Sequence, residues 1–110
     1  ERSGDVRAAA VSALGLAAEK RELPHVVFEP LAEAARDRDM LVRTVAAVAI
    51  GKAASKSRLP ENLLSALRNA MQDLQREIRY NAVWSIGQVV MAGKNDISKA
   101  TLDALCKCLK

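Results

Sequence analysis

Apolar positions recur along this chain at helical spacing, and the whole pattern repeats every 36 residues. Three segments carry it: VRAAAVSALGLAA from Val6, VRTVAAVAIGKAA from Val42 and IRYNAVWSIGQVV from Ile78. In each segment an arginine follows the first residue, and a glycine stands nine positions after that first residue. A fixed period of this size is typical of solenoid or array proteins. The sequence therefore predicts three copies of one helical unit.

Each repeated segment presents an apolar stripe when its residues are projected at about 100° per residue. The stripe comprises Val6, Ala10, Ala13, Leu14 and Ala17; Val42, Ala46, Ala49, Ile50 and Ala53; and Ile78, Ala82, Ser85, Ile86 and Val89. Because a stripe of this kind is buried against another element, we expect all three to face a core. Gly15, Gly51 and Gly87 each cost a helix roughly 1 kcal/mol relative to alanine. We expect them to mark places where a neighbouring helix approaches closely.

The segments between these helices predict a second type of helix. LPHVVFEPLAEAARD and LPENLLSALRNAMQD both begin with Leu-Pro and end with an aspartate, again 36 residues apart. Proline is tolerated in the first turn of a helix and marks its start. A third copy, DISKATLDALCKCL, matches at an offset of 38, which places two extra residues in a loop near Gly93 and Lys94. Pro30 lies inside its segment, where it predicts a kink or a late helix start.

Composition supports a helical fold. The 110 residues include twenty alanines and only three aromatics, and they contain no Asn-Gly or Asp-Gly hairpin turn. We expect an all-α fold, an α-α superhelix of about six antiparallel helices. We expect residues 1–110 to form a single array with repeat boundaries near residues 22, 58 and 95. No apolar run is long enough to span a bilayer and no signal peptide is present, so we expect no membrane insertion and an intracellular location, cytoplasmic or nuclear.

The order of these features resembles the HEAT repeat. A first helix opens near proline, an aspartate follows at the turn, and a second helix carries VR..A..ALG. Asp37 and Arg43 are six residues apart, as are Asp73 and Arg79, and Glu1 and Arg7 keep that spacing with glutamate in place of aspartate. The resemblance implies antiparallel helix pairs stacked into a right-handed superhelix. It also implies a ladder between adjacent repeats formed by the turn aspartate and the second-helix arginine. An armadillo arrangement is disfavoured, because no regular third short helix is apparent.

The two ends lack the polar capping repeats that solenoids normally need for solubility. The chain begins at the turn position of one repeat and ends on a helix of the first type. We therefore expect it to be part of a longer array that continues into further repeats.

Catalytic chemistry has little support in the sequence. The single histidine, His25, has no second histidine with which to bind a metal, and no glycine loop that could hold a phosphate is present. Cys106 and Cys108 are two residues apart, which does not place them on one helical face; they are typical of reduced cysteines in an intracellular chain. We expect no enzyme activity, no cofactor and no metal.

Binding of a protein partner is the function that the pattern favours. The resemblance to HEAT proteins implies a scaffold whose second helices line a concave surface. Tyr80 and Trp84 lie four residues apart, on one face of such a helix, and Thr44 and Gln88 flank them. The sequence predicts an aromatic anchor there for a protein whose identity it does not specify. Alternatively, one or both rings pack sideways against a neighbouring repeat.

A nucleic-acid-binding helical-repeat module is the alternative function. The net charge is +4, and five cations following the second helices would form a basic ridge between repeats: Lys20, Arg21, Lys56, Arg58 and Lys94. Such a ridge could contact phosphates. The competing interpretation is that these cations stabilise helix C-termini through the helix dipole. A spacer whose surface binds nothing is a third interpretation.

Overall fold

The computed structural model describes residues 3–110, and Glu1 lies outside that range. The described residues form six α-helices, one short 3-10 helix and no strands, which confirms the all-α fold expected from the sequence. In chain order the elements are α1 (Gly4–Lys20), the 3-10 helix η1 (His25–Val27), α2 (Phe28–Ala34), α3 (Met40–Ala53), α4 (Glu61–Ala70), α5 (Arg76–Ala92) and α6 (Lys99–Lys107).

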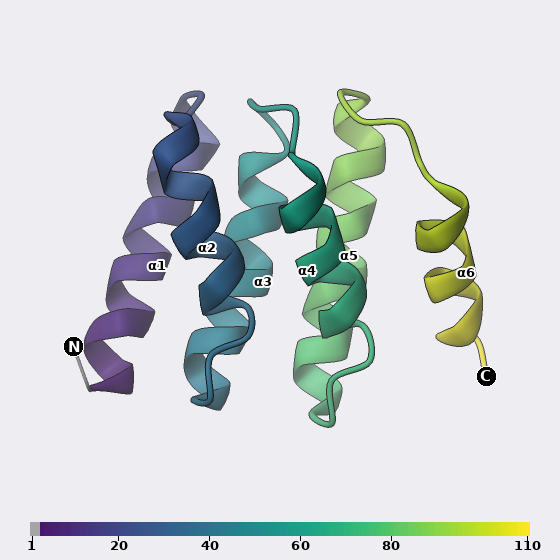
Figure 1. Ribbon diagram of the computed structural model, residues 1–110, viewed down its shortest axis with the longest axis horizontal. Helices are drawn as coiled ribbons and strands as arrows, with labels where there is room; N and C mark the ends of the chain where they lie inside the picture. Colours follow the sequence, from purple (N-terminus) through teal and green to yellow (C-terminus); the bar gives the residue numbers. More distant parts are fainter. Residues whose placement is uncertain (1–2) are drawn as a thin grey trace.

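The helices alternate between two layers (Figure 1). One layer holds the glycine-bearing helices α1, α3 and α5, and the other holds α2, α4 and α6. Within the first layer α1 packs on α3 and α3 on α5, while α2 and α4 cover α3 and α4 also contacts α5. Consecutive helices run in opposite directions, so the connections gather at two opposite edges of the molecule (Figure 1).

The core lies between the two layers, around α3, α4 and α5. The stripes expected on α3 and α5 are buried along their full length. Side chains that are almost completely buried there include Val42, Ile50, Leu63, Leu67, Ile78 and Ile86. Helix α6 joins this core only at one edge, where Thr101 and Ala104 are buried and Leu105 packs against it.

The stripe expected on α1 is not the face that α1 buries. Val6 is 53% exposed, Ala10 and Ala13 are exposed, and Leu14 and Ala17 are only partly buried. The buried residues of α1 are instead Ala8, Val11, Gly15 and Ala18. The physical reason is the neighbourhood of the helix. Helix α3 covers one side of α1, whereas on the side that corresponds to the buried stripes of α3 and α5 helix α2 makes only a limited contact with α1.

Local sequence signals set several helix ends. Pro30 stands in the first turn of α2, which begins only at Phe28, so the late start predicted from this proline is confirmed. The carboxylate of Asp39 caps α3 by accepting hydrogen bonds from the backbone amides of Leu41 (2.8 Å) and Val42 (3.4 Å). Helix α5 ends at Gly93, whose φ of 69° lies in the left-handed region that favours glycine.

The repeated glycines have different surroundings. A Cβ added to Gly15 would lie 3.0 Å from the Cβ of Ala49, and one added to Gly51 would lie 2.7 Å from the Cβ of Ser85. Two of the three positions therefore mark a close approach between neighbouring helices of the first layer. The same expectation is wrong for Gly87, where an added Cβ would meet nothing within 4 Å.

Candidate protein-binding surface

Two ion pairs link adjacent repeats at one edge of the molecule. The guanidinium of Arg7 donates from Nε to Oδ2 of Asp37 (2.8 Å) and from Nη2 to Oδ1 (3.0 Å). One repeat later, Arg43 donates from Nε to Oδ2 of Asp73 (2.9 Å) and from Nη2 to Oδ1 (3.4 Å). All four side chains are 13 to 22% exposed. Each pair joins residues 30 positions apart and so ties a second helix to the next turn.

The spacing of six that the sequence displays corresponds to a different contact. Nη1 of Arg43 donates to the backbone carbonyl of Asp37 (3.0 Å), and Nη1 of Arg79 donates to the carbonyl of Asp73 (2.8 Å). The six-residue contact is therefore made to the peptide backbone of the arginine's own turn. The carboxylate that each arginine reaches belongs to the following repeat, and Arg79 contacts no carboxylate among the residues that the structure describes.

The turn aspartates also organise the backbone around them. Oδ1 of Asp37 accepts the amide of Asp39 (2.8 Å), and Oδ1 of Asp73 accepts the amide of Gln75 (2.9 Å). The hydrogen bonds from the Arg7 side chain lower the pKa of the Asp37 carboxyl, and the backbone amide of Asp39 acts in the same direction against the opposing effect of partial burial. The carboxylate of Asp37 is thus stabilised in its charged form.

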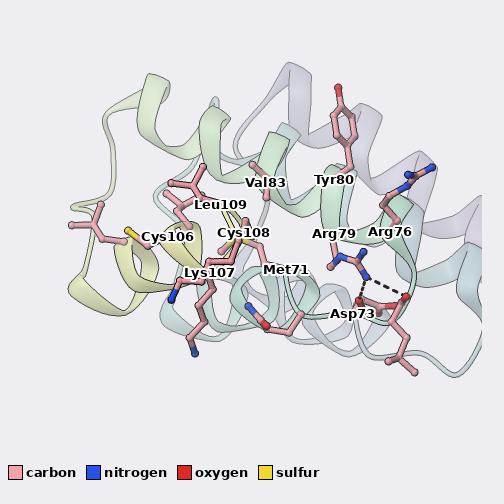
Figure 2. A pocket seen from close by; sticks show the side chains of 15 residues that line it. Met71, Asp73, Arg76, Arg79, Tyr80, Val83, Cys106, Lys107, Cys108 and Leu109 are labelled. Atoms are coloured by element: carbon pink, nitrogen blue, oxygen red, sulfur yellow. Dashed lines mark hydrogen bonds between the residues drawn. The ribbon is translucent and has the colours of Figure 1, made fainter.

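The residues predicted to contact a partner lie along the first layer. Trp84 is 41% exposed and Tyr80 is 70% exposed, whereas Thr44 and Gln88 are partly buried. Trp84 lies two positions before the buried Ile86, about 200° away around the helix, so it faces away from the second layer. Tyr80 lines a groove between α5 and α6, together with Val83. Figure 2 shows its ring extending away from the neighbouring Arg79.

The five cations of the basic ridge lie at the opposite edge from the ion pairs. Lys20 is the last residue of α1, and the other four cations belong to the connections after α1 (Arg21), α3 (Lys56 and Arg58) and α5 (Lys94), which share one edge in Figure 1. All five are exposed, and none of them takes part in an ion pair or side-chain hydrogen bond in the described part of the chain. Glu19, Glu22 and Asp96 are exposed in the same connections or next to them.

Potential metal ligands do not gather at one place within residues 3–110. No group of three or more potential metal ligands occurs there. His25 is exposed and lies against Phe28, with the two ring centroids 5.5 Å apart. Cys106 and Cys108 are both free and exposed. Over the same residues, no helix combines the length and the apolar character that crossing a bilayer requires.

Two features of the structure were not predicted from the sequence: a contact made by Asn95 and a groove beside α5. The side chain of Asn95 accepts the backbone amide of Leu59 (2.9 Å) and donates to its carbonyl (2.8 Å), which joins two inter-helix connections. The separation of 36 residues, one full repeat, was the only signal in the sequence that could have suggested this contact. The other feature is the groove between α5 and α6. Its presence depends on the distance between these two helices, which the sequence of neither helix specifies.

The chain matches the model of a known family over nearly its whole length. Residues 5–110, all but the first four positions, match the model of a family described as Cnd1, non-SMC mitotic condensation complex subunit 1. Comparison with curated proteins gave no match.

Proposed function

Since this chain belongs to the Cnd1 family, a HEAT-repeat-containing family of condensin subunit 1, we propose that it is a scaffold region that binds a partner protein during mitotic chromosome condensation. Members of this family are non-catalytic subunits of condensin, in agreement with the expectation that the chain is not an enzyme. In this proposal the partner is another component of the condensation complex, and the region acts in the nucleus or on chromosomes.

The exposed face of the first layer supports this proposal most directly. Trp84 projects from α5 on the side away from the second layer, and its large ring is 41% exposed. Leaving this much of a large apolar side chain in water is costly. Tryptophan and tyrosine are enriched at the energetic centres of protein interfaces, because they bury a large area and keep a polar tip. We therefore place the partner over Trp84, flanked by Tyr80, Gln88 and Thr44.

The test is the affinity of the complete subunit for the rest of the condensation complex. Trp84→Ala should weaken binding by about 2 kcal/mol, or roughly thirtyfold, while the melting midpoint of the isolated region stays nearly unchanged. Val26→Ala is the matched control, because Val26 is also a large exposed apolar residue but lies in the 3-10 helix before α2. Unchanged affinity in Trp84→Ala, or a large fall in its stability, would contradict the proposal.

A nucleic acid is the second candidate partner, and the basic ridge is the observation that favours it. Five exposed cations, none of them ion-paired within residues 3–110, share one edge. If they neutralise phosphates, replacing all five by glutamine should weaken duplex DNA binding. It should also flatten the salt dependence, with the slope falling by about 0.9 for each phosphate that is no longer neutralised. An unchanged slope would contradict phosphate binding and would favour the alternative that these cations stabilise helix C-termini through the helix dipole.

A further inference from the structure

A small pocket opens between the first turns of α3 and α5. It reaches the outer face of the first layer, which is the face that points away from the second layer and carries Trp84. Its volume is about 210 Å³, and its lining residues are Met40, Leu41, Thr44, Gln75, Glu77 and Ile78. A cavity of about 150 Å³ with apolar walls is large enough to bind benzene. The pocket therefore has room for one large apolar side chain.

Two exposed apolar residues form the α3 side of this pocket. Met40 is 51% exposed and Leu41 is 49% exposed. The other two copies of the repeat carry a carboxylate at the position of Leu41, namely Asp5 and Glu77. An acidic residue in the first turn stabilises a helix, and the side chain of Asp39 already caps α3. Leucine at this position does not serve the start of α3, whereas burial against another molecule would stabilise it.

The pocket is open because the first turns of α3 and α5 differ from those of α1 and α3. In the earlier pair the carboxylate of Asp39 lies against Gly4 and leaves no room for a Cβ there. In the later pair the corresponding residues are Gln75 and Met40. The side chain of Gln75 makes no capping hydrogen bond to α5 and is exposed. The space that Asp39 occupies in the earlier pair is therefore accessible in the later one.

An uncharged surface leads from the pocket to Trp84. Glu77 and Trp84 lie seven residues apart on one face of α5, a rise of about 10 Å. Val48 occupies the position of Trp84 on α3. Neither the residues from Thr44 to Gly51 nor those from Tyr80 to Ala92 include a charged side chain. Because charged residues are depleted at the centres of protein interfaces, this surface has the composition of such a centre.

Charges of opposite sign stand at the two ends of the uncharged surface. Glu77 lines the pocket at one end, and Lys52, eleven residues after Leu41, lies at the other. Neither side chain takes part in an ion pair or hydrogen bond among residues 3–110. Polar rims of this kind select a partner by charge complementarity. The partner segment is therefore expected to carry a cation near Glu77 and a carboxylate near Lys52.

The surface between the two ends offers few hydrogen bonds to an incoming backbone. The hydroxyl of Thr44 already donates to the carbonyl of Met40 (2.9 Å), and the backbone groups of α3 and α5 are bonded within their helices. An extended segment laid on this surface would leave its own amides and carbonyls without partners, which is costly on burial. An α-helix satisfies these groups internally, so the surface favours a helix.

We propose that an amphipathic α-helix of the partner lies along α3 and α5, with one large apolar side chain in the pocket beside Leu41 and an uncharged face against Val48 and Trp84. The distance from Leu41 to Lys52 is about 16 Å along the helix axis, so the contact spans about three turns of the partner helix. This inference rests on the proposed function, because it assigns a partner element to the Trp84 surface. The pocket is the part of it that can fail separately.

The first test is the affinity of the complete subunit for the rest of the condensation complex. Leu41→Glu should weaken binding about tenfold or more, because it places an unpaired carboxylate beside the buried apolar side chain. Its melting midpoint should stay unchanged, since the other two copies carry Asp5 and Glu77 at this position. Val26→Glu makes the same change at an exposed apolar residue in η1 and should bind normally.

A second variant closes the pocket without adding a charge. Thr44→Trp should occupy the pocket and weaken binding to a similar extent. Normal affinity in both Leu41→Glu and Thr44→Trp, together with weakened binding by Trp84→Ala, would overturn this inference and leave the proposed function in place. Normal affinity in all three variants would overturn both.

Photo-crosslinking distinguishes a helix from an extended segment. Benzoylphenylalanine is placed at Glu77 or at Gln88, which are eleven residues and about 16 Å apart along one face of α5. In the assembled complex, the two crosslinked sites should lie about eleven residues apart in one segment of one partner chain. A separation of about five residues would indicate an extended segment and would overturn the proposal. Crosslinks to two different chains would overturn it as well.

Discussion

Gly51 of α3 and Ser85 of α5 face each other where these two helices come closest. A Cβ added to Gly51 would lie 2.7 Å from the Cβ of Ser85 and 2.9 Å from its Cα. Real Cβ atoms do not approach other carbons this closely, so the glycine permits the contact. The hydroxyl of Ser85 completes it with a hydrogen bond to the carbonyl of Ala47.

We expect Gly51→Val to destabilise the fold by about 1–3 kcal/mol, because a branched side chain would overpack a buried contact. The matched substitution is Gly87→Ala, which should instead stabilise by about 1 kcal/mol, since alanine is the better helix former and nothing lies within 4 Å of the new methyl. Urea unfolding of the two variants provides the comparison. A neutral or stabilising Gly51→Val would refute the account of close approach.

The ion pair between Arg43 and Asp73 should contribute measurable coupling. Exposed pairs contribute about 0–1 kcal/mol, whereas hydrogen bonds to charged groups reach about 1.5–3 kcal/mol. With both side chains 13 to 20% exposed, we expect a coupling of about 1–2 kcal/mol in a double-mutant cycle of Arg43→Ala and Asp73→Ala. Arg79→Ala removes only contacts to backbone carbonyls and should cost less than Arg43→Ala. Equal costs would indicate that the carboxylate adds nothing.

Stability should fall at acidic pH in a way that depends on Asp37. The pKa of its carboxyl is lowered in the folded chain below the usual 3.8, chiefly by the hydrogen bonds from Arg7. A lowered folded pKa means that the stabilisation is fully present above the unfolded value and is lost as pH falls through the folded value. Asp37→Asn should be less stable near neutral pH and should show a flatter stability profile below pH of about 4. Urea midpoints measured across this range check the prediction, and parallel profiles would contradict it.

Asn95 should hold two connections together. Its side chain makes both possible hydrogen bonds to the backbone of Leu59, at 2.9 and 2.8 Å. Leu59 is buried, so Asn95→Ala would leave a backbone amide and carbonyl without their partner and should cost about 1–3 kcal/mol. Hydrogen exchange at the Leu59 amide should accelerate as well. Asn69→Ala, at an exposed position on α4, is the control and should change neither quantity.

Much of the helical framework could be predicted from the sequence alone. The period of 36 residues located the three glycine-bearing helices, Leu-Pro located two of the helices between them, and Pro30 indicated the late start of α2. These features are local: they depend on helix propensity, on proline geometry and on the spacing of apolar residues along a single helix. The apolar stripes of α3 and α5 were also placed correctly. Both helices have α4 packed against them, so the apolar side of each does face the core.

The sequence did not determine which repeated positions are in contact, because a repeat assigns the same residues to different surroundings. Val6 and Val42 occupy the same place in the repeat, yet Val6 is half exposed and Val42 is fully buried. The sequence predicted a ladder between adjacent repeats from Asp37, Arg43, Asp73 and Arg79, but it did not specify that the carboxylate of Arg43 would be that of Asp73, 30 residues after it. Gly51 and Gly87 are equivalent in sequence, but only Gly51 has a helix against it. Burial and pairing are properties of two surfaces, and only the tertiary structure decides which second surface each helix meets.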